Sequence, residues 1–117
     1  MPKLIALICK KPEISDENFQ AYYEEQHAPL IRSIFPMLRD YRRTYLPRSN
    51  LLYGEFTLEA DTLGTVCSVI TELGFKNQID LDAFMELAAK NEIVETIRED
   101  ESNFLMSDKT IMYQLDE

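Results

Sequence analysis

The longest periodic stretch of this 117-residue chain lies between residues 16 and 35. Its apolar residues fall on one side of a helical wheel drawn at about 100° per residue. They are Phe19, Tyr22, Tyr23, Leu30, Ile31 and Ile34. Ser15 is a typical N-cap, and Pro36 ends the segment. A long amphipathic helix over 16–35 therefore has to pack against another layer of structure.

Short apolar or alternating segments predict that second layer. A helical region begins at 79–91 and is expected to continue in short turns toward Leu105. Four segments are predicted to be strands: 3–10, 38–46, 66–75 and 107–117. The order β-α-β-β-α-β predicts an α+β fold of the ferredoxin-like kind, with a four-stranded antiparallel sheet. The length of 117 residues indicates a single domain, 1–117.

Helices cover only one face of such a sheet. The other face is left bare, and a second copy of the chain is the simplest partner for it. We therefore expect a homodimer.

The net charge of −9 limits the other partners. An acidic protein repels nucleic acid and anionic membranes, so we expect neither as a partner. The arginine-rich segment 38–48 has two interpretations: a patch that binds nucleic acid or carboxylates, or a strand with a solvated edge. The acidic surface favours the strand.

The longest apolar run, residues 4–9, is far shorter than the ~20 residues of a membrane span. Lysines flank it and no small-residue cleavage site follows, so a secretory signal is not expected. The two cysteines, Cys9 and Cys67, are expected at the same end of neighbouring strands, as buried thiols rather than a disulfide. These features predict a cytoplasmic protein.

Two long segments resemble a known family. Residues 14–46, ISDENFQAYYEEQHAPLIRSIFPMLRDYRRTYL, are similar to the opening signature of the EthD-like family of the dimeric α/β-barrel superfamily. That signature has a phenylalanine-led helix, a His-Ala-Pro-Leu turn and a strand with a tyrosine. Residues 97–117 resemble its closing segment, with an acidic residue, a phenylalanine and a final strand.

The resemblance implies a dimer whose two sheets form a barrel, with a pocket between helices and sheet in each subunit. Related proteins include isomerases, polyketide cyclases, anthrone-processing enzymes and monooxygenases that work without a metal. His27 falls on the family's helix histidine and Tyr41 on its strand tyrosine. Tyr23 stands where tryptophan is usual and Thr44 where asparagine is common, so the resemblance supplies no substrate.

His27 is the only histidine, and it lies within the apolar side of the predicted helix. It is either a core histidine with satisfied hydrogen bonds or a general acid/base in an apolar pocket. No second histidine and no ligand spacing support a metal site. Pro29 cannot donate to the carbonyl of Glu25, so the helix should bend and open a space that His27 faces. A plain packing kink is the alternative.

Tyr41 and Tyr45 share one face of the strand 38–46, because side chains alternate with period two. With Tyr22 or Tyr23 above them they form either an aromatic pocket or ordinary core packing. In a pocket, Tyr41 would polarise a carbonyl while His27 takes a proton from carbon. The predicted catalytic residues are His27 and Tyr41. The predicted substrate-binding residues are Tyr23, Tyr45, Phe19, Leu30 and Cys67.

The chain has no glycine-rich phosphate loop and no zinc-ligand spacing, so we expect neither cofactor nor metal. The leading hypothesis is a cofactor-independent isomerase, cyclase or lyase acting on a small hydrophobic oxo, aromatic or polyketide-like compound. The alternatives are a non-catalytic, ligand-binding or stress-associated dimeric module and a metal-free monooxygenase. Residues 47–64 are expected to form a functional flap or an extra hairpin.

Overall fold

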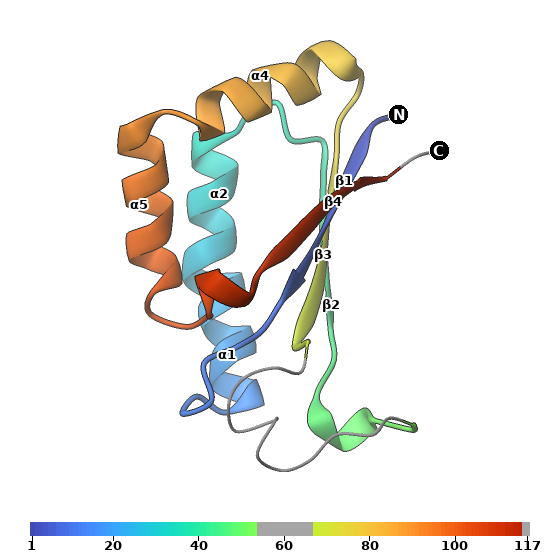
Figure 1. Ribbon diagram of the computed structural model, residues 1–117, viewed down its shortest axis with the longest axis vertical. Coiled ribbons are helices and arrows are strands. Elements are labelled where there is room, and N and C mark those ends of the chain that lie inside the picture. The colour runs from blue at the N-terminus through green and yellow to red at the C-terminus, as the bar shows by residue number, and fades with distance from the viewer. Residues whose placement is uncertain (54–66, 116–117) are drawn as a thin grey trace.

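The computed structural model describes residues 1–53 and 67–115. A four-stranded antiparallel sheet in the order β2-β3-β1-β4 forms one layer, and the helices lie on one side of it (Figure 1). The strands are β1 (Lys3–Ile8), β2 (Asp40–Tyr45), β3 (Val69–Gly74) and β4 (Ile111–Leu115). The predicted α+β, ferredoxin-like fold is confirmed, although each described strand is shorter than predicted.

The helical layer has more parts than the sequence predicts. Its elements are α1 (Asp16–Tyr22), the π turn η1 (Tyr23–His27), α2 (Ala28–Ile34), α4 (Gln78–Ala88) and α5 (Asn91–Glu101). The side chains of Ser15 and Asn77 cap α1 and α4 by accepting backbone N–H bonds. The expected short turns after residue 91 are wrong, because that segment forms the regular helix α5.

Two short 3-10 turns complete the described elements: η2 (Arg48–Asn50) and η3 (Ser107–Lys109). Most of the predicted flap or hairpin at 47–64 lies outside the described residues. None of the described helices is both long and apolar enough to cross a membrane.

The predicted helix 16–35 contains a π turn at its middle. The N–H of Ala28 bonds to the carbonyl of Tyr23, five residues earlier. In an α-helix the ring of Pro29 would clash with the carbonyl four residues before it, and the wider π turn relieves that clash. The bend expected at Pro29 therefore takes the form of a π turn. The rings of Tyr23 and Phe104 pack beside His27, where open space was expected.

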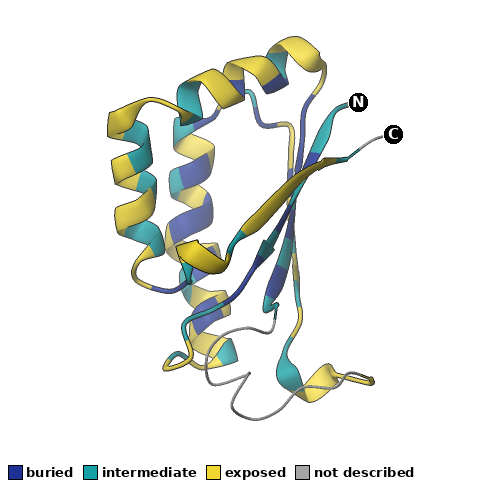
Figure 2. Cartoon of the chain, viewed as in Figure 1, coloured by how far each residue is buried: buried dark blue, intermediate teal, exposed yellow. Residues whose placement is uncertain are grey.

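The core lies between the helices and the sheet (Figure 2). Alternate residues of β1 are buried against the helices, as the pleat of a strand requires. The largest of the fully buried side chains are aromatic: Tyr23, Phe19, Phe35, Phe75 and Phe104. By contrast, β4 is exposed along most of its length.

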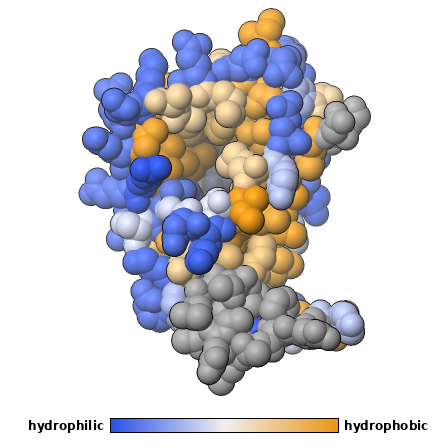
Figure 3. Space-filling view, viewed as in Figure 1, coloured by the Kyte–Doolittle hydropathy of each residue, from blue (hydrophilic) through white to orange (hydrophobic). Residues whose placement is uncertain are grey.

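The sheet face that the helices leave uncovered is apolar over β1 and β4. The strand register places Ile5 beside Tyr113 and Leu7 beside Ile111, with Ile70 of β3 on the other side of Leu7. Ile111 is 50% exposed and Tyr113 57% exposed. In the space-filling view, hydrophobic side chains gather over β4, at the edge of this face (Figure 3). This face fits the homodimer that the sequence predicts.

We expect the protein to have a mass near twice 13.7 kDa in light scattering, because a second copy would cover the apolar face. Ile111→Lys should shift it toward the monomer, since a charge would be buried in that contact. Thr96→Lys, on the exposed side of α5, is the matched control and should leave the mass unchanged. A monomeric wild-type protein at micromolar concentration would contradict the dimer.

Candidate functional site

Tyr23, the first residue of the π turn, is the centre of a buried polar network. It is 2% exposed, and its hydroxyl lies 2.9 Å from Oγ1 of Thr71 on β3. The hydroxyl of Tyr41 on β2 donates to the Tyr23 oxygen over 3.3 Å. Burial raises the pKa of both tyrosines. Both hydroxyls therefore stay protonated at neutral pH and act as hydrogen-bond donors.

His27, the last residue of the π turn, is hydrogen-bonded to the end of α5. Its Nδ1 lies 2.7 Å from Oδ2 of Asp100, and the two side chains are 5% and 18% exposed. An ionised carboxylate only accepts hydrogen bonds, so in the neutral imidazole Nδ1 carries the proton and Nε2 has the free lone pair. The other oxygen of Asp100 accepts from the hydroxyl of Tyr22 over 2.7 Å.

The surroundings of His27 combine aromatic rings with negative charge. Its ring centroid is 5.3 Å from that of Tyr23 and 5.0 Å from that of Phe104. Glu101 is a second acidic group near the imidazole. Burial raises the pKa of Glu101, while a hydrogen bond from Ser107 and the charge of His27 oppose the rise. His27 therefore lies among apolar rings with two acidic side chains on one side.

Arg43 joins β2 to the π turn. Its Nε donates to Oε2 of Glu24 and its Nη2 donates to Oε1, both over 2.8 Å. Oε2 of Glu24 also accepts from the hydroxyl of Tyr45 over 2.6 Å. The guanidinium lies 4.5 Å from the ring centroid of Tyr41, in cation–π contact. The hydrogen bonds from Arg43 hold the pKa of Glu24 below its ordinary value. These contacts fix the π turn against the sheet.

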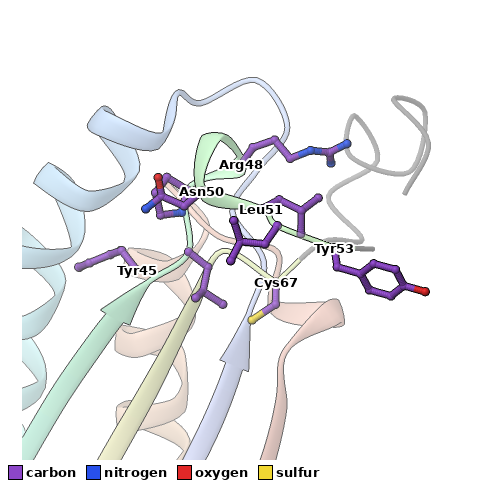
Figure 4. Close-up of a pocket in the computed structure, with 9 residues that line it drawn as sticks. Tyr45, Arg48, Asn50, Leu51, Tyr53 and Cys67 are labelled. Atoms are coloured by element: carbon purple, nitrogen blue, oxygen red, sulfur yellow. The ribbon is translucent and has the colours of Figure 1, made fainter. Parts of the chain in front are cut away.

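A cavity of about 490 Å³ opens where β2 ends and β3 begins. Figure 4 shows Leu51 and Cys67 at this cavity, with the side chain of Tyr45 directed away from it. Its lining residues are Tyr45, Leu46, Pro47, Arg48, Asn50, Leu51, Leu52, Tyr53 and Cys67. The lining is largely apolar and suits a hydrophobic ligand. His27 is not among these residues.

The structure brings most of the predicted site residues together. His27, Tyr23, Tyr45 and Phe19 belong to one cluster of rings, which Tyr41 joins through its bond to Tyr23. No contact among the described residues joins Tyr41 to His27 directly.

Two predicted lining residues lie elsewhere. Leu30 is only partly buried and lies apart from the hydrophobic side chains packed against the core. Cys67 lines the cavity at the end of the sheet instead. A substrate beside His27 would therefore contact rings of the cluster rather than this thiol.

Asp100 and Phe104 are the site residues that sequence reasoning did not assign. Both belong to the closing segment whose acidic residue and phenylalanine resemble the family signature. That resemblance was the available signal, but it gave no partner for either residue. The partner is clear only in three dimensions, because His27 and Asp100 are 73 residues apart in the chain.

The two cysteines lie near each other as free thiols, just outside the ends of the paired strands β1 and β3. Cys9 is buried as predicted, but Cys67 is only partly buried. Burial raises the pKa of Cys9, and the neighbouring Cys67 adds to the rise. Within residues 1–53 and 67–115, no three His, Cys, Asp or Glu side chains gather into a possible metal site.

The EthD domain model matches residues 11–108, which is most of the chain. The chain belongs to the EthD family. The EthD match therefore confirms the resemblance seen in the sequence. No curated protein matches the chain.

Solved structures support the fold of this EthD chain. An ethyl tert-butyl ether d (EthD) family protein from Bacillus halodurans is 23% identical, with a TM-score of 0.62, over 100% of this chain and 98% of its own. A dimeric protein of unknown function with a ferredoxin-like fold, from Bacteroides fragilis, is 14% identical, with a TM-score of 0.56, over 99% and 95%. A dimeric ferredoxin-like protein of unknown function from Jannaschia is 16% identical, with a TM-score of 0.52, over 98% and 99%.

Tyr23→Phe should lower the free energy of unfolding by about 1–3 kcal/mol, because buried hydroxyls of Thr71 and Tyr41 would lose their partner. Urea unfolding measures the change. Tyr53→Phe is the matched control, because Tyr53 is 90% exposed. This variant should leave the free energy of unfolding unchanged. Equal stability of the two variants would show that the hydroxyl network contributes little.

Glu24→Gln should destabilise the protein at pH 7 but progressively less in acid. The folded-state pKa of Glu24 lies below its ordinary value of 4.5, so the stabilisation is complete above that value and is lost as the pH falls through the lower folded pKa. A pH series of urea unfolding curves tests this, with the exposed Glu95→Gln as control. If the difference in the free energy of unfolding between Glu24→Gln and wild type stayed the same in acid, this prediction would be wrong.

Proposed function

We propose that this EthD chain is a cofactor-independent enzyme, an isomerase, cyclase or lyase, that moves protons on a small, partly hydrophobic oxo compound. The observation that carries the proposal is the pair of buried His27 and partly buried Asp100, whose Nδ1 and Oδ2 atoms lie 2.7 Å apart. A carboxylate on Nδ1 fixes the tautomer of an imidazole and stabilises the charged form during proton transfer.

The chemistry assigned to His27 is general acid/base catalysis. Nε2 takes a proton from the carbon next to a carbonyl, and the electron pair of that C–H bond moves into the enolate. The imidazolium then returns the proton to another atom of the same molecule, so no oxidant or reductant is consumed. Histidine suits both steps because it exchanges a proton near neutral pH.

The tyrosines supply hydrogen-bond donors in this proposal. A carbonyl oxygen gains negative charge as the carbon acid loses its proton, and a donor nearby stabilises that charge. Tyr41 is assigned this role, with Tyr23 and Tyr45 lining the site, as predicted from the sequence. Both hydroxyls are protonated at neutral pH, and Tyr41 would take this role by turning its O–H from the Tyr23 oxygen, 3.3 Å away, toward the carbonyl.

A non-catalytic, ligand-binding module is the second candidate. The apolar cavity that includes Leu51 and Cys67 favours it, because His27 takes no part in its lining. In that case hydrophobic ligands would bind equally to wild type and His27→Gln, and Leu51→Asp would abolish binding.

His27→Gln should remove enzymatic activity while leaving the fold intact. The test incubates the protein in D₂O with a panel of small ketones and β-diketones and follows deuterium at the carbon next to the carbonyl by NMR. Glutamine keeps a hydrogen-bonding end near Asp100 but cannot exchange a proton near neutral pH. We expect the rate to fall by about 100- to 10,000-fold, the usual value of general acid/base help.

The control for this test is Thr96→Ala, a surface change on α5 that should leave exchange as in wild type. Melting temperatures of all three proteins show whether the loss is chemical. If His27→Gln is destabilised but retains its rate per folded molecule, His27 is structural. If the wild type accelerates exchange of no compound in the panel, the binding module becomes the better assignment.

A further inference from the structure

Tyr22 and His27 share one carboxylate. The Tyr22 hydroxyl donates to Oδ1 of Asp100 over 2.7 Å, and Nδ1 of His27 lies 2.7 Å from Oδ2. Both oxygens of Asp100 are thus occupied by side chains from a single helical segment. Asp100 itself belongs to α5, far along the chain.

The π turn is what brings these two donors to the same side of the segment. Residues five apart in an α-helix are separated by about 140° around the axis, at about 100° per residue. A π turn closes its hydrogen bonds at i to i+5, so residues five apart come onto the same side of the segment. The bond from Ala28 N–H to Tyr23 O marks this geometry between Tyr22 and His27.

A further residue fixes the direction of the hydrogen bonds. Nδ2 of Asn103 donates to the Tyr22 oxygen over 3.0 Å and also lies 3.3 Å from the Glu99 carbonyl. Because the Tyr22 oxygen accepts from Asn103, its own proton is directed to Asp100. Burial and the Asp100 carboxylate raise the pKa of Tyr22, which keeps that proton in place. The chain of donors runs from Asn103 through Tyr22 to Asp100.

We propose that Tyr22 is a positioning residue that holds the Asp100 carboxylate so that His27 keeps its proton on Nδ1 and presents Nε2 as the base. The inference rests on the proposed function, since it gives the acid/base histidine its tautomer. The Asp100 side chain is 18% exposed. Without the Tyr22 hydroxyl, the carboxylate would be able to turn toward water and leave Nδ1 without its acceptor.

The imidazole tautomer can be observed directly, because His27 is the only histidine of the chain. Protein labelled with ¹⁵N-histidine gives one pair of ring nitrogen signals, whose shifts report which nitrogen carries the proton. We expect the Nδ1–H form in wild type. In Tyr22→Phe the signals should move toward the Nε2–H form, and the Nδ1 proton should exchange with water about tenfold faster or more, as loss of a hydrogen bond to a charged group predicts.

Tyr22→Phe keeps the ring, whose centroid lies 4.8 Å from that of Phe104, so packing is preserved. Tyr53→Phe, at an exposed site, is the matched control and should give the wild-type tautomer. If Tyr22→Phe does not fold, Asn103→Ala provides the test. It removes the donor to Tyr22, together with the bond to the Glu99 carbonyl, and should shift the signals in the same direction. The inference would be overturned if Tyr22→Phe kept the wild-type tautomer and the wild-type exchange rate of the Nδ1 proton. If Asn103→Ala is used instead, the same result in that variant would overturn it.

Turnover separates this inference from the proposed function. A tautomer change in the variant together with an inactive wild type would overturn the enzymatic function and leave the positioning role of Tyr22 standing. An active wild type whose Tyr22→Phe variant keeps the Nδ1–H form would overturn the positioning role alone. Where both hold, we expect Tyr22→Phe to lower kcat with little change in KM, because the hydroxyl does not touch the substrate.

Discussion

The carboxylate of Asp100 is the contact on which the arrangement of the helices around the site depends. Helix α5 has no fully buried residue, so its position relies on partly buried side chains and on the hydrogen bonds of Asp100 to His27 and Tyr22. Phe104, just beyond α5, is completely buried and packs against the His27 ring. The contacts that place α5 are therefore the same ones that orient the imidazole, so stability and chemistry are coupled at this point.

Local patterns in the sequence were enough for the fold, but not for the pairs that define the site. The helix 16–35 and the four strands were predicted because periodicity and caps act within a few residues. The π turn was missed. Pro29 indicates a disturbed helix, but it does not specify whether the neighbouring N–H groups bond to the carbonyl four or five residues earlier. Asp100 was missed because its partner lies 73 residues away in the chain. The regular helix α5 was predicted only as short turns, although Ile93 and Ile97, four residues apart, pack against the core as one helical face requires.

The cluster around His27 and the apolar cavity are two separate regions joined by Tyr45. The ring of Tyr45 contacts Tyr23 within the cluster, and the residue also forms part of the cavity wall. Its hydroxyl is held by Glu24, which Arg43 holds in turn. Among the described residues, the side chains of Tyr45 and Tyr23 therefore connect the cavity to the imidazole.

The strand order has a consequence for how the chain folds. The central strand β1 pairs with β3 on one side and with β4, the last strand, on the other. The sheet is therefore complete only after β4 has been synthesised, and most of its pairings join distant segments. Folding rates fall as contacts become less local, so this small protein should fold slowly for its size. Until β4 arrives, one edge of β1 stays open to strands of other chains.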